Sequence, residues 1–148
     1  MKKHLFLFGG GPPFTPVLAS EFSNLNTMDD SIAILFLERK GSEEYLQSTV
    51  THILEEKGIK NFYYIPLQST PVDIAVDRIC KSSSIIICGG DTNRYADYIV
   101  ETNIAKAIKE SYNSGKPIVG FSAGALISPD VCIISAKDNE KKEYQERN

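Results

Sequence analysis

The stretch Lys116-Pro-Ile-Val-Gly-Phe-Ser122-Ala-Gly-Ala125 decides the fold of this 148-residue chain. Its apolar residues predict a short buried strand, and the small residues that follow predict a tight turn at Ser122. The segment 120–124 matches the G-x-S-x-G pattern, in which a serine at a strained strand-to-helix turn is held above a sheet. There the backbone N–H of the next residue, Ala123, can stabilise an oxyanion. An ordinary Gly-Ser-Gly turn ending a strand is the alternative interpretation of these five residues.

Strands and helices alternate along the chain before this stretch. Apolar runs predict strands at 4–8, 31–37, 62–67 and 84–88. Amphipathic periodicity predicts helices at 42–58, 70–80 and 102–113, and a short helix is predicted at 14–24 with Pro16 near its first turn. Strands that are apolar throughout are typical of a sheet covered on both faces. We therefore predict an α/β fold: a three-layer, mostly parallel sheet with helices on both faces.

Several local features are predicted within this frame. The first strand, 4–8, is apolar throughout, so we expect it to be central in the sheet. We expect Ser42 to cap its helix, and Tyr45 and Val72 to lie on buried helix faces. Asp91 or Thr92 is expected to cap the helix that follows the fourth strand.

Composition limits the classes of partner. A net charge of -3 without a basic block argues against nucleic acid, and no apolar run is long enough to span a bilayer. The basic start and short apolar segment are interrupted by the glycines and prolines of 9–13, which favours a first strand over a signal peptide. We therefore predict a cytoplasmic protein that contacts neither nucleic acid nor membrane.

The cysteines predict neither a disulfide framework nor a metal site. Cys80, Cys88 and Cys132 are odd in number and form no C-x-x-C pair. We expect all three to be small buried hydrophobic residues. No cluster in the sequence implies a metal or an organic cofactor, so none is predicted.

Three loops are expected at the same edge of the sheet, because ligands of such folds lie beyond the carboxyl ends of the strands. These loops are 9–13, 89–92 and the turn at Ser122. The Gly90 N–H is a natural second oxyanion donor beside that of Ala123. The triple glycine at 9–11 could instead cradle a phosphate, but it lacks the spacing of a phosphate-binding motif.

Two segments carry a family resemblance. Cys88-Gly-Gly-Asp-Thr-Asn-Arg-Tyr95 and Ile118-Val-Gly-Phe-Ser-Ala-Gly-Ala125 resemble the two core motifs of the dipeptidase E and cyanophycinase family of serine peptidases. That family has a flavodoxin-like fold related to class I glutamine amidotransferases, and the resemblance extends from the first strand to about Asp138.

The resemblance implies roles for four residues. Ser122 would be the nucleophile, and the Gly90 and Ala123 amides would form the oxyanion hole. Asp138 would be the triad acid if one insertion is allowed, whereas the alternative is one more charge in the polar tail 137–148. The implied substrates are small peptides, among them dipeptides with an N-terminal aspartate.

The chain departs from the family at the histidine that would serve as base. Both histidines, His4 and His52, precede Ser122, whereas the family's histidine follows the acid. His4 opens the first strand, and His52 is expected on a solvated helix face beside Glu55 and Glu56. We therefore predict a single peptidase-like domain at 1–136, incomplete at its C-terminal end.

Several interpretations of the missing histidine stay open. The chain could be a truncated enzyme, or a degenerate relative that acts as a non-catalytic binding or interaction domain. A base could also come from elsewhere, such as Lys137 or a partner subunit. A glutaminase-like enzyme is disfavoured because the turn carries serine, and Cys132 lies beyond it. An incomplete sheet would have an unprotected edge, so a homodimer is a further prediction.

Overall fold

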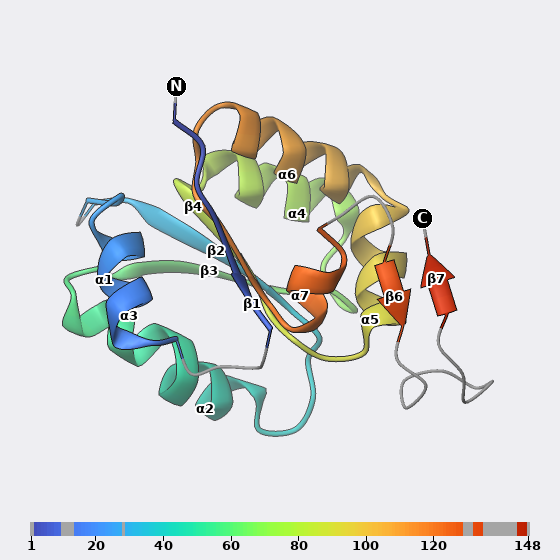
Figure 1. Ribbon diagram of the computed structural model, residues 1–148, viewed down its shortest axis with the longest axis horizontal. Helices are drawn as coiled ribbons and strands as arrows, with labels where there is room; N and C mark the ends of the chain where they lie inside the picture. The colour runs from blue at the N-terminus through green and yellow to red at the C-terminus, as the bar shows by residue number, and fades with distance from the viewer. Residues whose placement is uncertain (1, 10–13, 28, 129–131, 135–144, 148) are drawn as a thin grey trace.

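Five parallel strands form the central sheet of the computed structural model, which describes residues 2–9, 14–27, 29–128, 132–134 and 145–147 (Figure 1). Their spatial order is β1-β5-β4-β2-β3. The strands are β1 (Leu5–Phe8), β2 (Ser31–Phe36), β3 (Asn61–Pro66), β4 (Ser84–Ile87) and β5 (Ile118–Phe121). A separate antiparallel pair consists of β6 (Cys132–Ile134) and β7 (Gln145–Arg147), so part of the segment expected as a polar tail is a strand.

Helices cover both faces of the sheet, which confirms the predicted three-layer α/β fold (Figure 1). One face is covered by α1 (Pro16–Ser23) and by a continuous helical run made of α2 (Ser42–Leu46), η1 (Gln47–Thr51) and α3 (His52–Glu56). The other is covered by α4 (Val72–Lys81), α5 (Thr92–Tyr95), η2 (Ala96–Val100) and α6 (Asn103–Asn113). The short helix α7 (Ala123–Leu126) follows β5 directly. No helix of the described residues is both long and apolar enough to cross a membrane.

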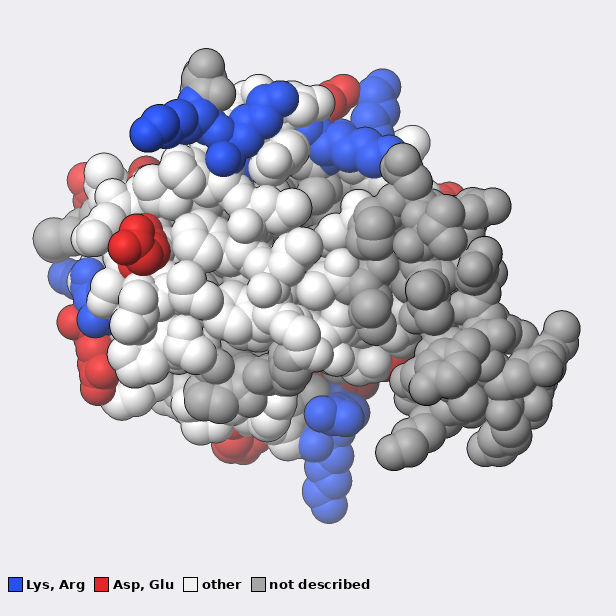
Figure 2. Space-filling model, viewed as in Figure 1, with Lys and Arg blue, Asp and Glu red and all other residues white. Residues whose placement is uncertain are grey.

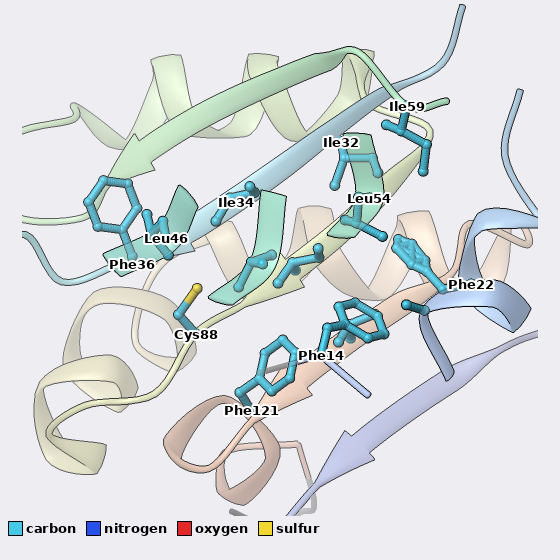
Figure 3. Packing of buried hydrophobic residues seen from close by; sticks show 14 residues of the cluster. Phe14, Phe22, Ile32, Ile34, Phe36, Leu46, Leu54, Ile59, Cys88 and Phe121 are labelled. Carbon is cyan, nitrogen blue, oxygen red and sulfur yellow. The ribbon is translucent and has the colours of Figure 1, made fainter. Parts of the chain in front are cut away.

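Alternation along the strands divides the interior into two cores. Successive side chains of a strand point to opposite faces, so Ile34 of β2 packs toward α2 and α3 while Leu35 packs toward α4. The first core contains an aromatic group close to the end of β5 (Figure 3). Its rings are Phe8, Phe14, Phe22 and Phe121, with Phe8 and Phe121 stacked at 4.6 Å between centroids. These rings give the end of β5 a rigid, buried support.

The expectation that the first strand is central is wrong. Within the described residues β1 pairs only with β5 and lies at an edge of the sheet. Phe6 and Phe8 pack against the first core, whereas Leu5 and Leu7 are 46% and 50% exposed. A run with apolar residues at every position cannot distinguish a central strand from an edge strand that is covered on one face.

Figure 2, in the same view, looks onto this edge. The middle of that face carries uncharged side chains, whereas Lys and Arg gather along its upper rim, above the start of β1.

Other local predictions differ from the structure in instructive ways. Ser42 is not the N-cap, because Gly41 takes that position and the Ser42 hydroxyl accepts a hydrogen bond from the Arg39 N–H. Tyr45 is 44% exposed, because it lies about 100° around the helix from its buried neighbour Leu46. Val72 is also exposed, at the first turn of α4.

Cys80 is exposed rather than buried, and the side chain of Cys132 lies outside the described residues.

The start of α5 confirms the sequence prediction. The Asp91 side chain accepts a hydrogen bond from the Arg94 N–H at 3.1 Å and caps α5. The Thr102 hydroxyl caps α6 in the same way, accepting from the Ile104 N–H. The cap at Asp91 is important for the site, because it fixes the chain immediately after the loop at the end of β4.

Burial of Cys88 predicts a loss of stability at alkaline pH. Burial raises the pKa of this thiol from its usual 9.0 to about 12. Above about pH 9 the unfolded chain releases a proton that the folded chain keeps, so the free energy of unfolding falls as pH rises toward about 12. By about pH 10.5 this difference in proton binding at Cys88 lowers the free energy of unfolding by about 2 kcal/mol.

Denaturant unfolding between about pH 8 and about pH 10.5 measures this effect. We expect Cys88→Ala to show a shallower decline of stability with pH than the wild-type chain. The matched control is Cys80→Ala, which changes an exposed cysteine and should leave the slope unchanged. Identical slopes in all three proteins would contradict the assignment.

Candidate active site

The carboxyl ends of β1, β5 and β4 lie side by side, because these strands are consecutive in the sheet. The Ser122 N–H donates to the Phe8 carbonyl at 2.9 Å, which joins the end of β1 to the turn after β5. A Cβ placed on Gly89, after β4, would lie 3.2 Å from the Ser122 Cβ. The structure therefore brings Ser122 and the Gly89-Gly90 loop together, as the sequence indicates. Of the loop 9–13, only Gly9 is among the described residues.

Ser122 has a strained backbone. Its φ is 52° and its ψ is -108°, and among the described residues it is the one non-glycine residue with positive φ. The turn is closed by the Ala125 N–H, which donates to the Ser122 carbonyl at 2.9 Å. Ala123 is the first residue of α7, where a helix offers its N–H no intrahelical acceptor. Residues 120–124 therefore form a sharp strand-to-helix turn, called the elbow below, and an amide N–H without an intrahelical acceptor follows Ser122.

The elbow is possible only because two positions lack side chains. A Cβ on Gly124 would collide with the Ile87 carbonyl oxygen of β4. A Cβ on Gly120 would lie 2.7 Å from the Gly124 carbonyl oxygen, closer than real Cβ atoms approach. The strand end, the turn and the start of α7 therefore pack backbone against backbone.

The loop after β4 presents the second predicted amide donor. Gly90 is exposed and has φ of 155°, a conformation that side chains disfavour. A Cβ placed on Gly90 would lie 3.0 Å from Cε2 of Tyr95, so the aromatic ring packs against the loop. Tyr95 belongs to the motif Cys88–Tyr95, but no local pattern in the sequence singles it out. Its contribution depends on contacts between separate segments.

Neither histidine of the chain is placed to activate Ser122. The His4 carbonyl accepts a hydrogen bond from the Ile118 N–H at the start of the β1–β5 pair, whereas Ser122 follows its other end. His52 lies on an exposed side of α3, where its Nε2 is 3.1 Å from Glu56. The predicted acid Asp138 and the alternative base Lys137 lie outside the described residues.

Cys88 is an unsuitable nucleophile, although it stands between β4 and the Gly89-Gly90 loop. Only 6% of its surface is exposed, and burial keeps its thiol protonated at neutral pH by raising the pKa to about 12. Among the described residues no group of three or more His, Cys, Asp or Glu side chains is arranged to hold a metal ion.

Comparison with known proteins agrees with this geometry. The sequence model of peptidase family S51 matches residues 36–147, which include both loops of the site. The chain belongs to peptidase family S51.

Three similar proteins are longer than this chain. An uncharacterized peptidase of Listeria monocytogenes is 28% identical, over 95% of this chain and 68% of its own length. A crystal structure of a peptidase from an acI-B1 actinobacterium superposes with a TM-score of 0.69 at 21% identity, over 90% of this chain and 60% of its own. A putative peptidase E from Listeria monocytogenes gives a TM-score of 0.68 at 21% identity, over 85% and 61%. The chain thus spans about three fifths of the two solved structures.

The backbone packing at the elbow predicts that Gly124→Ala is severely destabilising. The added methyl group would collide with the Ile87 carbonyl, and the strand-to-helix turn must open to accept it. We expect a loss of about 3 kcal/mol or more in the free energy of unfolding. Ala125→Gly, at the next position of α7, is the control and should cost about 1 kcal/mol. Equal, small losses from both substitutions in urea unfolding would show that the elbow is not packed in this way.

Proposed function

We propose that this chain carries the nucleophile and oxyanion hole of a serine peptidase that hydrolyses small peptides. The observation that carries the proposal is the strained Ser122, at φ 52°, with Gly89 packed against its side chain. A strained residue is retained where surrounding structure holds it, and such residues cluster at reactive sites. Membership of peptidase family S51 supports the same reaction class.

The proposed reaction proceeds in two steps. The Ser122 Oγ attacks the carbonyl carbon of the scissile peptide, and its proton passes through a base to the leaving amine. The carbonyl oxygen becomes negatively charged and is stabilised by the N–H groups of Gly90 and Ala123. Water then attacks the acyl-serine ester, which releases the acid product and restores the Ser122 hydroxyl.

The base is proposed to come from outside the described residues. Neither His4 nor His52 is available to Ser122, and the relatives extend beyond the part that this chain covers. The S51 resemblance puts a histidine in that part. The alternatives are Lys137 of this chain and a residue of a second subunit.

Peptides with an N-terminal aspartate are the proposed substrates. The resemblance to dipeptidase E motivates this choice. Arg39 is exposed and follows Leu37, whose N–H donates to the Tyr95 hydroxyl at 3.2 Å. Because β2 and β4 are neighbours in the sheet, Arg39 follows the same edge of the sheet as the Gly89-Gly90 loop, and it is the proposed partner of the carboxylate of an aspartyl substrate.

A second candidate function is a non-catalytic domain that binds peptides at the elbow. The position of both histidines away from Ser122 is the observation that favours it. Such a domain would bind aspartyl peptides without cleaving them.

Hydrolysis of an aspartyl p-nitroanilide tests the peptidase proposal. We expect turnover by the wild-type chain to fall about 100-fold or more in Ser122→Ala, because the oxyanion hole alone leaves only residual catalysis. Ser48→Ala, an exposed serine on η1, is the control and should retain wild-type activity. Equal rates for wild type and Ser122→Ala would overturn the peptidase proposal and leave the binding domain.

The same assay tests substrate choice when alanyl and lysyl p-nitroanilides are included. We expect the aspartyl compound to be preferred, and the preference to shrink about 10-fold in Arg39→Gln as a carboxylate partner is lost. Lys40→Gln removes the adjacent exposed charge and serves as control. A wild-type preference for the lysyl compound would contradict the aspartyl proposal.

A further inference from the structure

We propose that Tyr95 is a positioning residue, which aims the Gly90 N–H at the oxyanion by holding the Gly89 carbonyl. The inference rests on the proposed function, because it assigns a supporting role to a residue beneath the proposed oxyanion hole. Tyr95 makes no contact with the substrate in this proposal and acts through the Gly89-Gly90 peptide unit alone.

The hydroxyl of Tyr95 connects two strand ends. It donates to the Gly89 carbonyl at 3.0 Å and accepts a hydrogen bond from the Leu37 N–H at 3.2 Å. Leu37 follows β2 and Gly89 follows β4, and these two strands are neighbours in the sheet. The side chain is fully buried, with 0% of its surface exposed. The tyrosine therefore ties the loop that bears Gly90 to a rigid strand of the sheet.

The geometry of the peptide unit explains how the hydrogen bond from Tyr95 to the Gly89 carbonyl orients the Gly90 N–H. The Gly89 carbonyl and the Gly90 N–H belong to one planar peptide unit and point in opposite directions when it is trans. Fixing the oxygen on the Tyr95 side therefore aims the N–H away from Tyr95. Glycine at both positions leaves the loop free to rotate otherwise, so an external constraint is needed.

Packing on both sides completes the arrangement. The Cβ position of Gly90 lies 3.0 Å from Tyr95 Cε2, and that of Gly89 lies 3.2 Å from Ser122 Cβ. The loop is thus held between the tyrosine ring and the elbow serine. Helix α5, which carries Tyr95, also packs against α7, which begins at Ala123. The two amides of the oxyanion hole are therefore positioned by neighbouring helices.

The tyrosine donates its hydrogen bond throughout the working pH range. Burial, followed by the nearby Cys88, raises the pKa of its hydroxyl well above the usual value. The group stays neutral and protonated, so loss of the proton does not release the Gly89 carbonyl near neutral pH.

Tyr95→Phe tests the inference, because it deletes the hydroxyl and keeps the ring. The hydrogen bond to the oxyanion forms in the transition state, so we expect kcat to fall about 10-fold to 100-fold with KM within about 2-fold of wild type. Tyr98→Phe, a half-buried tyrosine on η2, is the matched control and should keep wild-type values. Thermal unfolding of each variant monitors the fold independently.

A second readout does not depend on catalysis. In protein labelled with ¹⁵N-glycine, the backbone order parameter of Gly90 should fall in Tyr95→Phe and stay unchanged in Tyr98→Phe. Wild-type kcat, or a raised KM with unchanged kcat, in Tyr95→Phe would overturn the inference. If the wild-type chain and Ser122→Ala are equally inactive, the proposed function fails, and an unchanged Gly90 order parameter then overturns the positioning role separately.

Discussion

The carbonyl oxygen of Ile87 occupies the space that a side chain at Gly124 would need, and the site depends on this close approach. It brings the start of α7 against the end of β4. Because β5 must then turn sharply, Ser122 is forced to a positive φ, and its side chain is placed beside Gly89. One backbone contact thus sets the position of the candidate nucleophile relative to the candidate amide donors.

The surrounding fold resists the strain of this turn. The ring of Phe121, immediately before Ser122, stacks on Phe8 and meets Phe14 edge to face. On the other side Tyr95 joins the loops after β2 and β4. A turn held from both sides can keep an unfavourable backbone conformation, which an isolated turn of the same sequence would relax.

The sequence predicted most of the fold because its signals are local. Buried strands such as 84–88, the cap at Asp91 and the G-x-S-x-G turn depend on residues close together in the chain. The position of β1 at the edge was missed because apolar residues stand at all four of its positions, and the pattern does not report which neighbours a strand has.

The candidate site was predictable in part, for the same reason. The elbow and the paired glycines are visible as short motifs, whereas Tyr95 gains its role from a hydrogen bond to Leu37, 58 residues away. Tyr45 was placed on the wrong face because it is apolar in part and adjoins Leu46, whereas consecutive helical residues lie about 100° apart and only Leu46 is buried. Neither histidine lies at Ser122: His4 is at the opposite end of the β1–β5 pair, and His52 pairs with Glu56 on an exposed helix face.

A crystal structure of the chain after reaction with a fluorophosphonate would identify the nucleophile and the groups that bind the oxyanion. We expect phosphorus bonded to the Ser122 Oγ, with one phosphoryl oxygen at about 3 Å from both the Gly90 and the Ala123 nitrogen. An adduct on another residue, an oxygen directed away from both amides, or no adduct after prolonged exposure would contradict it.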